Sequence, residues 1–113
     1  MTLRDRETLP GARLVQPDSG AFAVLSDAYT SDLLSDVMAH APAGSVLITL
    51  QAHANTVAVA TLAGIRAILI CHNRPAPPDM IEAARRECIA VAVCPLSQYE
   101  ASRRIRRLLE TAP

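Results

Sequence analysis

The sequence predicts a single α/β domain, with a mostly parallel sheet of four to five strands and helices on both faces of the sheet. Half of the 113 residues are apolar but only three are aromatic, so the core must be built from Ala, Val, Ile and Leu. In the second half of the chain, short β-favouring runs alternate with helical patterns, and crossovers of this kind give parallel strands. A chain of this length can bury a core without a metal or a disulfide.

The first part of the chain predicts an arm and two short strands. Residues 1–11 are polar and end in a Pro-Gly pair, so we expect a loose, flexible arm before the domain at residues 12–110. Residues 12–16 are a short apolar strand closed by a turn cluster, and residues 22–25 are a second strand candidate. Residues 26–32 are polar and rich in helix-capping side chains, which predicts the approach to a helix.

The middle of the chain predicts a helix, a strand and a second helix. The first helix is ended by Pro42 and Gly44. Its apolar face, at helical spacing, consists of Leu33, Leu34, Val37, Met38 and Ala41. Residues 45–50 form an unbroken β-favouring run, which is short enough for a strand buried on both faces of a sheet. Residues 57–62 are predicted to be a short buried helix that Gly64 ends.

The last third predicts two further strands and two further helices. Residues 65–71 and 89–94 are buried strands. Between them a helix begins at Pro78, and one face of it carries Ile81, Ala84, Arg85 and Cys88. The final helix begins at a capping box formed by Ser97 and Glu100. Its buried side carries Ala101, Ile105, Leu108 and Leu109.

The composition excludes several classes of partner. Eleven cationic side chains, all of them Arg, balance eleven Asp and Glu, so no net field draws the protein to nucleic acid or to an anionic membrane. No apolar run reaches the roughly 18–20 residues of a membrane span, and residues 1–13 are too polar for the core of a signal peptide. We therefore expect a cytoplasmic protein with neither nucleic acid nor membrane as a partner.

The sequence contains no Lys and none of the motifs G-x-G-x-x-G, G-x-S-x-G or H-E-x-x-H. A Walker A loop needs Lys to hold phosphates and Schiff-base chemistry needs its amine, so both are excluded. The three cysteines lie among apolar neighbours, which is typical of reduced thiols used as small core side chains. Cys71 and His72 are adjacent on a predicted strand and face opposite sides of the sheet, so they cannot share one metal. We expect neither a metal nor a cofactor.

Polar segments that follow the predicted strands carry the candidate site. In parallel sheets the ligand crevice lies beyond the carboxyl ends of the strands, and free N–H groups at helix N-termini favour an anion such as a phosphate or a carboxylate. Arg74 can add a bidentate contact to the same ion. The candidate ligand-binding residues are Asp27, Ser31, Asp32, Gln51, His53, Asn55, His72, Arg74 and Ser97.

Some of these residues also have a simpler structural interpretation. Asn55, Ser97 and either Thr30 or Ser31 have the side chains of ordinary helix caps. The four arginines within residues 103–107 have two interpretations as well. They stabilise the C-terminal end of the last helix through its dipole, or they dock an acidic partner.

Two segments of the sequence resemble the DRTGG domain family. They are YTSDLLSDVM at residues 29–38 and ITLQAHANTVAVA at residues 48–60, and the similarity runs from about residue 12 to residue 109. Members of the family occur as the amino-terminal part of HPr kinase/phosphorylase, inside some phosphotransacetylases and between regulatory domains of certain pyrophosphatases. Ser26-Asp27-Ala28 stands where Thr-Gly-Gly is expected, so this turn lacks the backbone freedom of the two glycines.

The resemblance implies a regulatory α/β module that commonly pairs with a copy of itself, since the family's kinase activity belongs to a separate P-loop domain. We therefore expect a non-catalytic, homodimeric module that senses a small anionic metabolite or nucleotide, or binds a partner enzyme. The apolar content of this short chain also favours a dimer. One alternative is a protein–protein interaction subunit without a small-molecule ligand. Another is a small enzyme that uses His53, His72 or Cys94.

Overall fold

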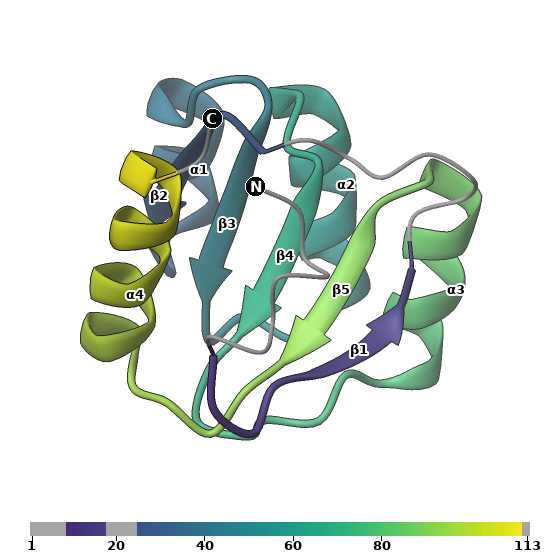
Figure 1. Ribbon diagram of the computed structural model, residues 1–113. Helices are drawn as coiled ribbons and strands as arrows, with labels where there is room; N and C mark the ends of the chain where they lie inside the picture. Colours follow the sequence, from purple (N-terminus) through teal and green to yellow (C-terminus); the bar gives the residue numbers. More distant parts are fainter. Residues whose placement is uncertain (1–8, 18–24, 112–113) are drawn as a thin grey trace.

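Five short strands form one sheet with the order β1-β5-β4-β3-β2 (Figure 1). Strands β2 to β5 are parallel, and β1 runs antiparallel along β5. The computed structural model describes residues 9–17 and 25–111. In chain order the elements are β1 (Arg13–Gln16), β2 (Asp27–Thr30), α1 (Leu34–His40), β3 (Ser45–Thr49), α2 (Ala54–Ala63), β4 (Ala67–Ile70), α3 (Pro78–Glu87), β5 (Ala90–Val93) and α4 (Gln98–Thr111). The predicted fold class, a single mostly parallel α/β domain, is confirmed.

The order of the parallel strands decides which face each helix covers. From β2 to β5 the strands follow one another in both chain and space, and crossover connections between parallel strands are right-handed. Three successive crossovers in one direction therefore put α1, α2 and α3 on the same face. Helix α4 follows the last parallel strand and covers the other face beside β2 and β3 (Figure 1).

The three central strands are buried along their whole length, as expected for parallel strands that are covered on both faces. Successive side chains point to opposite faces. Leu47 and Ile68 pack toward α1, α2 and α3, whereas Val46 and Leu69 pack toward α4. Burial of each such side chain stabilises the fold by roughly 1.5–3 kcal/mol, so the sheet is held between two apolar cores.

Strand β2 lies where the sequence predicted a polar approach to a helix. Of the alternative strand candidate, residues 22–24 lie outside the described residues, and Leu25 is buried but not part of a strand. Residues 27–30 pair in register with β3, so that Tyr29 lies opposite Leu47. Pairing with a buried strand has outweighed the weak β-preference of a polar segment. The prediction for this stretch was therefore wrong.

The N-terminal side of the domain begins earlier than residue 12. Residues 1–8 of the predicted arm lie outside the described residues. Leu9 is only 2% exposed and packs into the core on the α4 face. Gly11 follows with a φ of 74°, and a Cβ added there would lie 2.8 Å from Cγ of Pro95. The turn at Leu9–Gly11 is thus pressed against the segment between β5 and α4.

Two helix faces differ from their predicted apolar stripes. In α1 only Val37 is buried, while Leu33 and Met38 of the predicted face are 64% and 45% exposed. In α3 the buried residues are Met80, Ala83 and Ala84. The predicted α3 face was therefore wrong for Arg85 and Cys88, which are both exposed. Successive residues of a helix point in different directions, so an error of one residue in assigning the buried face moves a side chain from the core to the surface.

Helices α2 and α3 end in the same way. Gly64 and Cys88 are their C-cap residues, with left-handed φ angles of 75° and 59°. The next residue, Ile65 or Ile89, donates its N–H to a carbonyl inside the helix and is buried. Glycine suits the left-handed position because it has no Cβ, whereas Cys88 adopts the conformation at a cost.

Helix α4 begins with the Ser97 half of the predicted capping box, whereas the Glu100 side chain bonds to arginines of the helix. The Ser97 hydroxyl accepts a hydrogen bond from the backbone N–H of Glu100 at 3.1 Å. The Glu100 carboxylate pairs with Arg103 and Arg104, and hydrogen bonds from these guanidiniums lower its pKa to about 2. Ala101 and Ile105 are buried on the sheet side. None of the helices in the described ranges has both the length and the apolar content needed to span a membrane.

The two matching C-caps offer a paired test of stability. Cys88→Gly removes a side chain from a left-handed position and is expected to raise the free energy of unfolding by about 1 kcal/mol. Gly64→Ala places a Cβ in that conformation, 3.0 Å from Cβ of Ala43, and is expected to lower it by at least about 1 kcal/mol. Denaturant unfolding measures both. A Cys88→Gly variant less stable than the parent would contradict this account of α3.

The ion pairs of Glu100 predict that the free energy of unfolding decreases at low pH. Its folded-state pKa of about 2 lies below the ordinary value of 4.5. The stabilisation is therefore fully present above pH 4.5 and is lost as the pH falls toward 2. Urea unfolding of the parent and of Glu100→Gln should show the parent to be more stable at pH 7, but not at pH 2. A stability difference that survives at pH 2 would rule out the ion pairs as its source.

Candidate functional site

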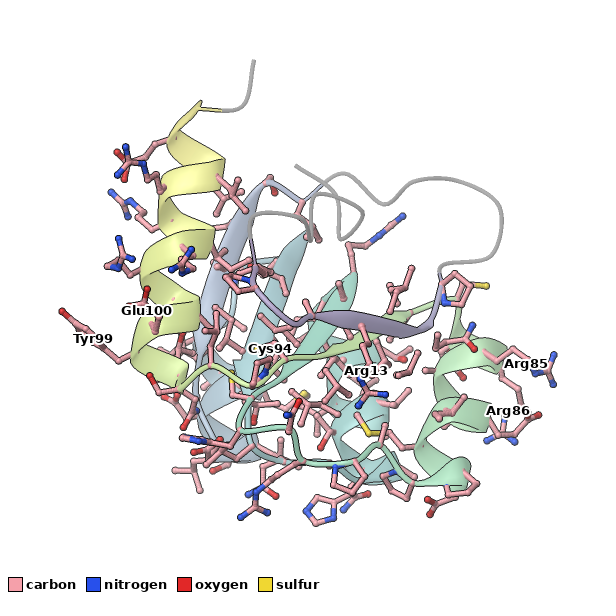
Figure 2. The ribbon with its side chains drawn as sticks, turned by 60° about the horizontal axis from the view of Figure 1, so that its bottom comes forward. Arg13, Arg85, Arg86, Cys94, Tyr99 and Glu100 are labelled. Atoms are coloured by element: carbon pink, nitrogen blue, oxygen red, sulfur yellow. The ribbon has the colours of Figure 1, made fainter. Side chains whose placement is uncertain are left out.

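The loops that leave the four parallel strands meet at the carboxyl edge of the sheet, which faces the reader in Figure 2. Backbone hydrogen bonds join them. The N–H of Cys71 donates to the carbonyl of Thr49 at 3.1 Å, and the N–H of His72 donates to the carbonyl of Leu96 at 2.9 Å. The polar segments after β2, β3, β4 and β5 therefore form one continuous surface, as the parallel topology requires.

Asp32 ties this edge together. Its Oδ1 accepts hydrogen bonds from the Thr49 hydroxyl at 3.0 Å, the Leu50 N–H at 2.8 Å and the Gln98 side-chain amide at 3.1 Å. These partners come from the end of β3, the loop after it, and the first turn of α4. One half-buried carboxylate, two residues after the end of β2, thus joins the sheet to α4, and its role in the structure is to hold these loops in place.

Gln51 and His53 continue the same network. The Gln51 side-chain amide donates to the backbone carbonyl of Asp32 at 2.9 Å, which leaves its Oε1 as the acceptor for His53 Nε2 at 2.6 Å. His53 therefore carries a hydrogen on Nε2, and its other ring nitrogen, Nδ1, is the one left for a ligand. His53 is exposed, whereas Gln51 is half-buried.

The loop between β4 and α3 has an unusual backbone. His72 and Asn73 are two successive residues with left-handed φ angles, 57° and 53°. The N–H of Asn73 donates to the carbonyl of Cys94 at 2.8 Å, which holds the loop against the start of the β5–α4 connection. His72 and Arg74 are exposed. Non-glycine residues in this conformation are uncommon and cluster at functional sites.

The remaining predicted residues fall into three groups. Ser97 caps α4, and Ser31 accepts a hydrogen bond from the N–H of Leu33 at 3.2 Å in the turn before α1, where Leu33 itself holds the cap position. Asn55 lies in the first turn of α2 and is exposed, and the cap position belongs to His53. Asp27 begins β2 and so lies at the amino end of the sheet. Its predicted position at the carboxyl edge was wrong, because β2 starts where a loop was expected.

The N-terminus of α2 differs in charge from those of the other helices in the described ranges. No side chain caps the first turn of α1, α2 or α3, but the first turn of α2 also carries no acidic residue. The first turns of α1, α3 and α4 contain Asp36, Asp79 and Glu100, whose negative charges already complement the helix dipole. The positive end of the α2 dipole therefore remains uncompensated by acidic side chains of its own turn.

A hydrogen-bonded group that the sequence analysis missed lies beside the edge. The Tyr29 hydroxyl donates to Oδ2 of Asp36 at 2.7 Å, and Nδ1 of His40 lies 3.0 Å from Oδ1. The Tyr29 hydrogen bond lowers the pKa of Asp36 and raises the pKa of Tyr29. The four-residue spacing of Asp36 and His40 on α1 was the available signal. Tyr29 gave none, because its strand was not foreseen.

The arginine run on α4 does not occupy the last turn of the helix, which contains no basic residue. The dipole interpretation of these arginines was therefore wrong. Arg103 and Arg104 pair with Glu100, and Arg106 pairs with Glu110. Arg103, Arg106, Arg107 and Glu110 line a shallow surface hollow of about 440 Å³. The run is thus an ion-paired surface in the middle of α4.

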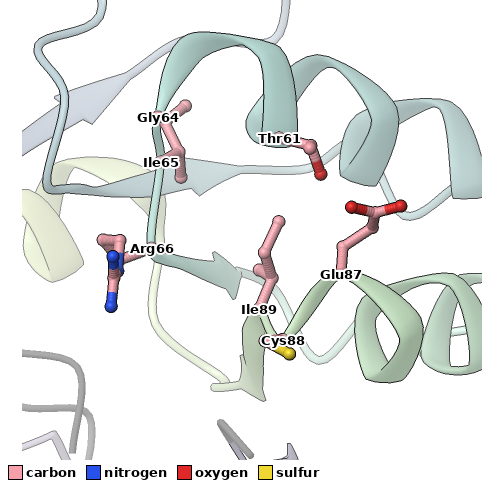
Figure 3. Close-up of a pocket in the computed structure, with 7 residues that line it drawn as sticks. All are labelled: Thr61, Gly64, Ile65, Arg66, Glu87, Cys88 and Ile89. Carbon is pink, nitrogen blue, oxygen red and sulfur yellow. The ribbon is translucent and has the colours of Figure 1, made fainter.

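A separate hollow of about 250 Å³ lies at the amino edge of the sheet (Figure 3). The twin C-caps Gly64 and Cys88 form two of its sides, and Arg66 and Glu87 supply its charged side chains. It therefore lies across the domain from the candidate residues at the carboxyl edge. In the described ranges, no cluster of three or more His, Cys, Asp or Glu side chains could hold a metal ion.

Comparison with known proteins adds one finding about the fold. The chain is similar to a crystal structure of the CBS and DRTGG domains of the regulatory region of Clostridium perfringens pyrophosphatase, complexed with the activator diadenosine tetraphosphate. The TM-score is 0.77 and the identity 16%, over 96% of this chain and 45% of that one. No family model and no curated protein matches. The likeness shows the fold alone, and it supports the DRTGG-like domain fold that the sequence resemblance implied.

Proposed function

We propose that the chain is a non-catalytic regulatory module that senses a small anionic metabolite or nucleotide at the carboxyl edge of its sheet. In this proposal it works in the cytoplasm as a homodimer and passes the signal to a partner enzyme. The observation that carries the proposal is the first turn of α2, which has neither a side-chain cap nor an acidic residue. A helix N-terminus of this kind attracts an anion through its N–H groups and its dipole.

Basic side chains in nearby loops support an anionic ligand. His53 stands at the cap of α2 with Nδ1 left for a ligand, while His72 and Arg74 lie on the neighbouring loop after β4. The guanidinium of Arg74 suits two oxygens of a phosphate or carboxylate. The left-handed backbone at His72 fixes the direction of this loop, so these side chains are presented by a defined surface.

The hydrogen-bond pattern supports binding in preference to catalysis. The hydroxyls of Thr49 and Thr56 at this edge both donate to protein oxygens, those of Asp32 and of the Gln51 backbone. Both threonines are fully buried, so neither hydroxyl is open to a substrate as a nucleophile. Oδ1 of Asp32 already accepts three hydrogen bonds from groups of the protein itself. The pyrophosphatase regulatory region that is similar in fold was crystallised with a dinucleotide activator, which is in keeping with a sensing role.

Exposed apolar side chains support the homodimer and also favour the second candidate function, an interaction subunit without a small-molecule ligand. Leu33, Met38 and Leu62 are 64%, 45% and 74% exposed on or beside α1 and α2. Large apolar side chains that a short chain leaves on its surface are suited to contact with another protein. The ion-paired arginines of α4 are the surface for an acidic partner in this second candidate.

Arg74 and Arg66 provide a matched test of ligand sensing. Both arginines are exposed, but Arg74 lies at the carboxyl edge and Arg66 at the amino edge. Calorimetric titration with ATP, diadenosine tetraphosphate and acetyl phosphate is expected to show binding of at least one probe. Arg74→Ala should weaken that binding about tenfold, which corresponds to about 1.4 kcal/mol, and Arg66→Ala should leave it unchanged. Absence of binding at millimolar concentration, or equal weakening by both variants, would favour the interaction subunit.

Light scattering at micromolar concentration tests the homodimer. We expect a mass of twice 12.1 kDa for the parent. Met38→Glu and Leu62→Glu place a charge on α1 and on α2 respectively, so the variant that lowers the mass identifies the helix at the interface. Neither substitution removes a buried side chain, so both variants should keep the parent's unfolding temperature. A parent mass of 12.1 kDa would reject the dimer.

A further inference from the structure

Two buried thiols lie side by side at the carboxyl ends of β4 and β5. The register of these strands pairs Ile70 with Val93, so the next residues along each strand, Cys71 and Cys94, face each other. The N–H of Cys94 donates to the carbonyl of Ile70 at 2.9 Å, which continues the ladder to this point. Figure 2 labels Cys94 where its strand leaves the sheet.

Both side chains point to the same face of the sheet. Cys71 follows Leu69, and Cys94 follows Ala92, in the alternation that faces α4, and all four belong to one core. Neighbouring strands lie about 4.7–4.9 Å apart, and disulfides usually join Cα atoms about 4.4–6.8 Å apart. The backbone therefore already holds the two cysteines at a separation that a disulfide accepts.

The pair also has the protonation chemistry of a reactive dithiol. The neighbouring Cys71 side chain lowers the pKa of Cys94, and so does the backbone N–H of Leu96. Cys94 and burial raise the pKa of Cys71. One sulfur is thus favoured as the thiolate and the other as its proton donor, which is the division of roles that thiol oxidation needs.

We propose that Cys71 and Cys94 form a hydroperoxide-sensitive dithiol that closes to an intramolecular disulfide. Cys94 is the peroxidatic residue and Cys71 the resolving residue. This goes beyond the proposed ligand sensing, because it assigns a covalent modification site in the core. It is also independent of that function, because its test needs no ligand.

The reaction balances in two steps. The Cys94 thiolate attacks one oxygen of the hydroperoxide, the O–O bond breaks, and a sulfenic acid forms at Cys94 while the leaving oxygen takes a proton as water or an alcohol. The Cys71 sulfur then attacks the sulfenic sulfur, its proton goes to the departing hydroxyl, and water leaves. Two thiols have lost two electrons and two protons, and the hydroperoxide has gained both.

The disulfide would join the two loops of the carboxyl edge at their bases. Residues 72–74 directly follow Cys71, and Pro95 directly follows Cys94, where it lies against the turn at Gly11. Both cysteines are fully buried, so the oxidant must be as small as hydrogen peroxide to reach them.

Cys88 is exposed and lies at the opposite edge, so it takes no part in the pair. It needs to be replaced so that its own oxidation does not obscure the measurement.

Mass spectrometry of the Cys88→Ser protein tests the proposal. The folded protein is treated with hydrogen peroxide, then denatured and alkylated. The expected product is about 2 Da lighter than the reduced protein and takes up no alkylating agent. Because the chain has no Lys and trypsin does not cut before Pro75, digestion should give one linked species joining residues 67–85 to residues 87–103. Two alkylated cysteines after treatment, or disulfides only between separate molecules, would overturn the proposal.

Single variants in the Cys88→Ser background assign the two roles. Cys71→Ser keeps a polar donor beside Cys94 and should leave a sulfenic acid there that dimedone traps, whereas Cys94→Ala should leave Cys71 unmodified over the same time. Equal labelling of both variants would overturn the assignment of roles. Thermal unfolding verifies that each variant is folded, and the mass measurement on the Cys88→Ser protein decides the existence of the disulfide even if a core variant fails to fold.

Discussion

The right-handedness of crossover connections is the constraint on which the layout of this domain depends. Four parallel strands in sequential order leave no point at which the strand order reverses, so the three helices between them share one face. The other face is left for α4 and for the segment that carries Leu9. Every loop that follows a parallel strand therefore emerges at one edge, with α4 on one side of it and three helix N-termini on the other.

Asp32 shows how this edge is held. Its carboxylate reaches Thr49 and Leu50 on the neighbouring strand and loop, and Gln98 on the helix across the sheet. A carboxylate that accepts several hydrogen bonds is stabilised in its place, so the loops around Asp32 are held in a defined arrangement. In the proposed function, the exposed Arg74 and the first turn of α2 are therefore the groups left to face an anion.

The sequence allowed prediction of those elements whose pattern is local. The buried strands β3, β4 and β5 and the Ser97 cap of α4 were all recognisable, because apolar runs and caps are local patterns in the chain. Strand β2 was not, since its residues are polar and owe their conformation to pairing with β3. The sequence predicted that the candidate site lies at the carboxyl edge of the sheet, but it did not predict the hydrogen bonds that join its loops. Nothing local to Gln98 indicates that its amide reaches Asp32, 66 residues away.

The position of α4 has a consequence for how the domain folds. Each of the strand–helix units β2–α1, β3–α2 and β4–α3 packs against the unit that follows it in the chain. Most contacts of the parallel sheet therefore join residues that are close in sequence. Helix α4 instead returns to the first parallel strand, where Ser102 meets Thr30 across 72 residues. Contacts of such separation require a long loop to close before they are rewarded, and the same holds for β1, where Arg13 pairs with Val93. The apolar face that receives Ile105 is therefore covered only by segments that lie far apart in the chain from the strands they pack on.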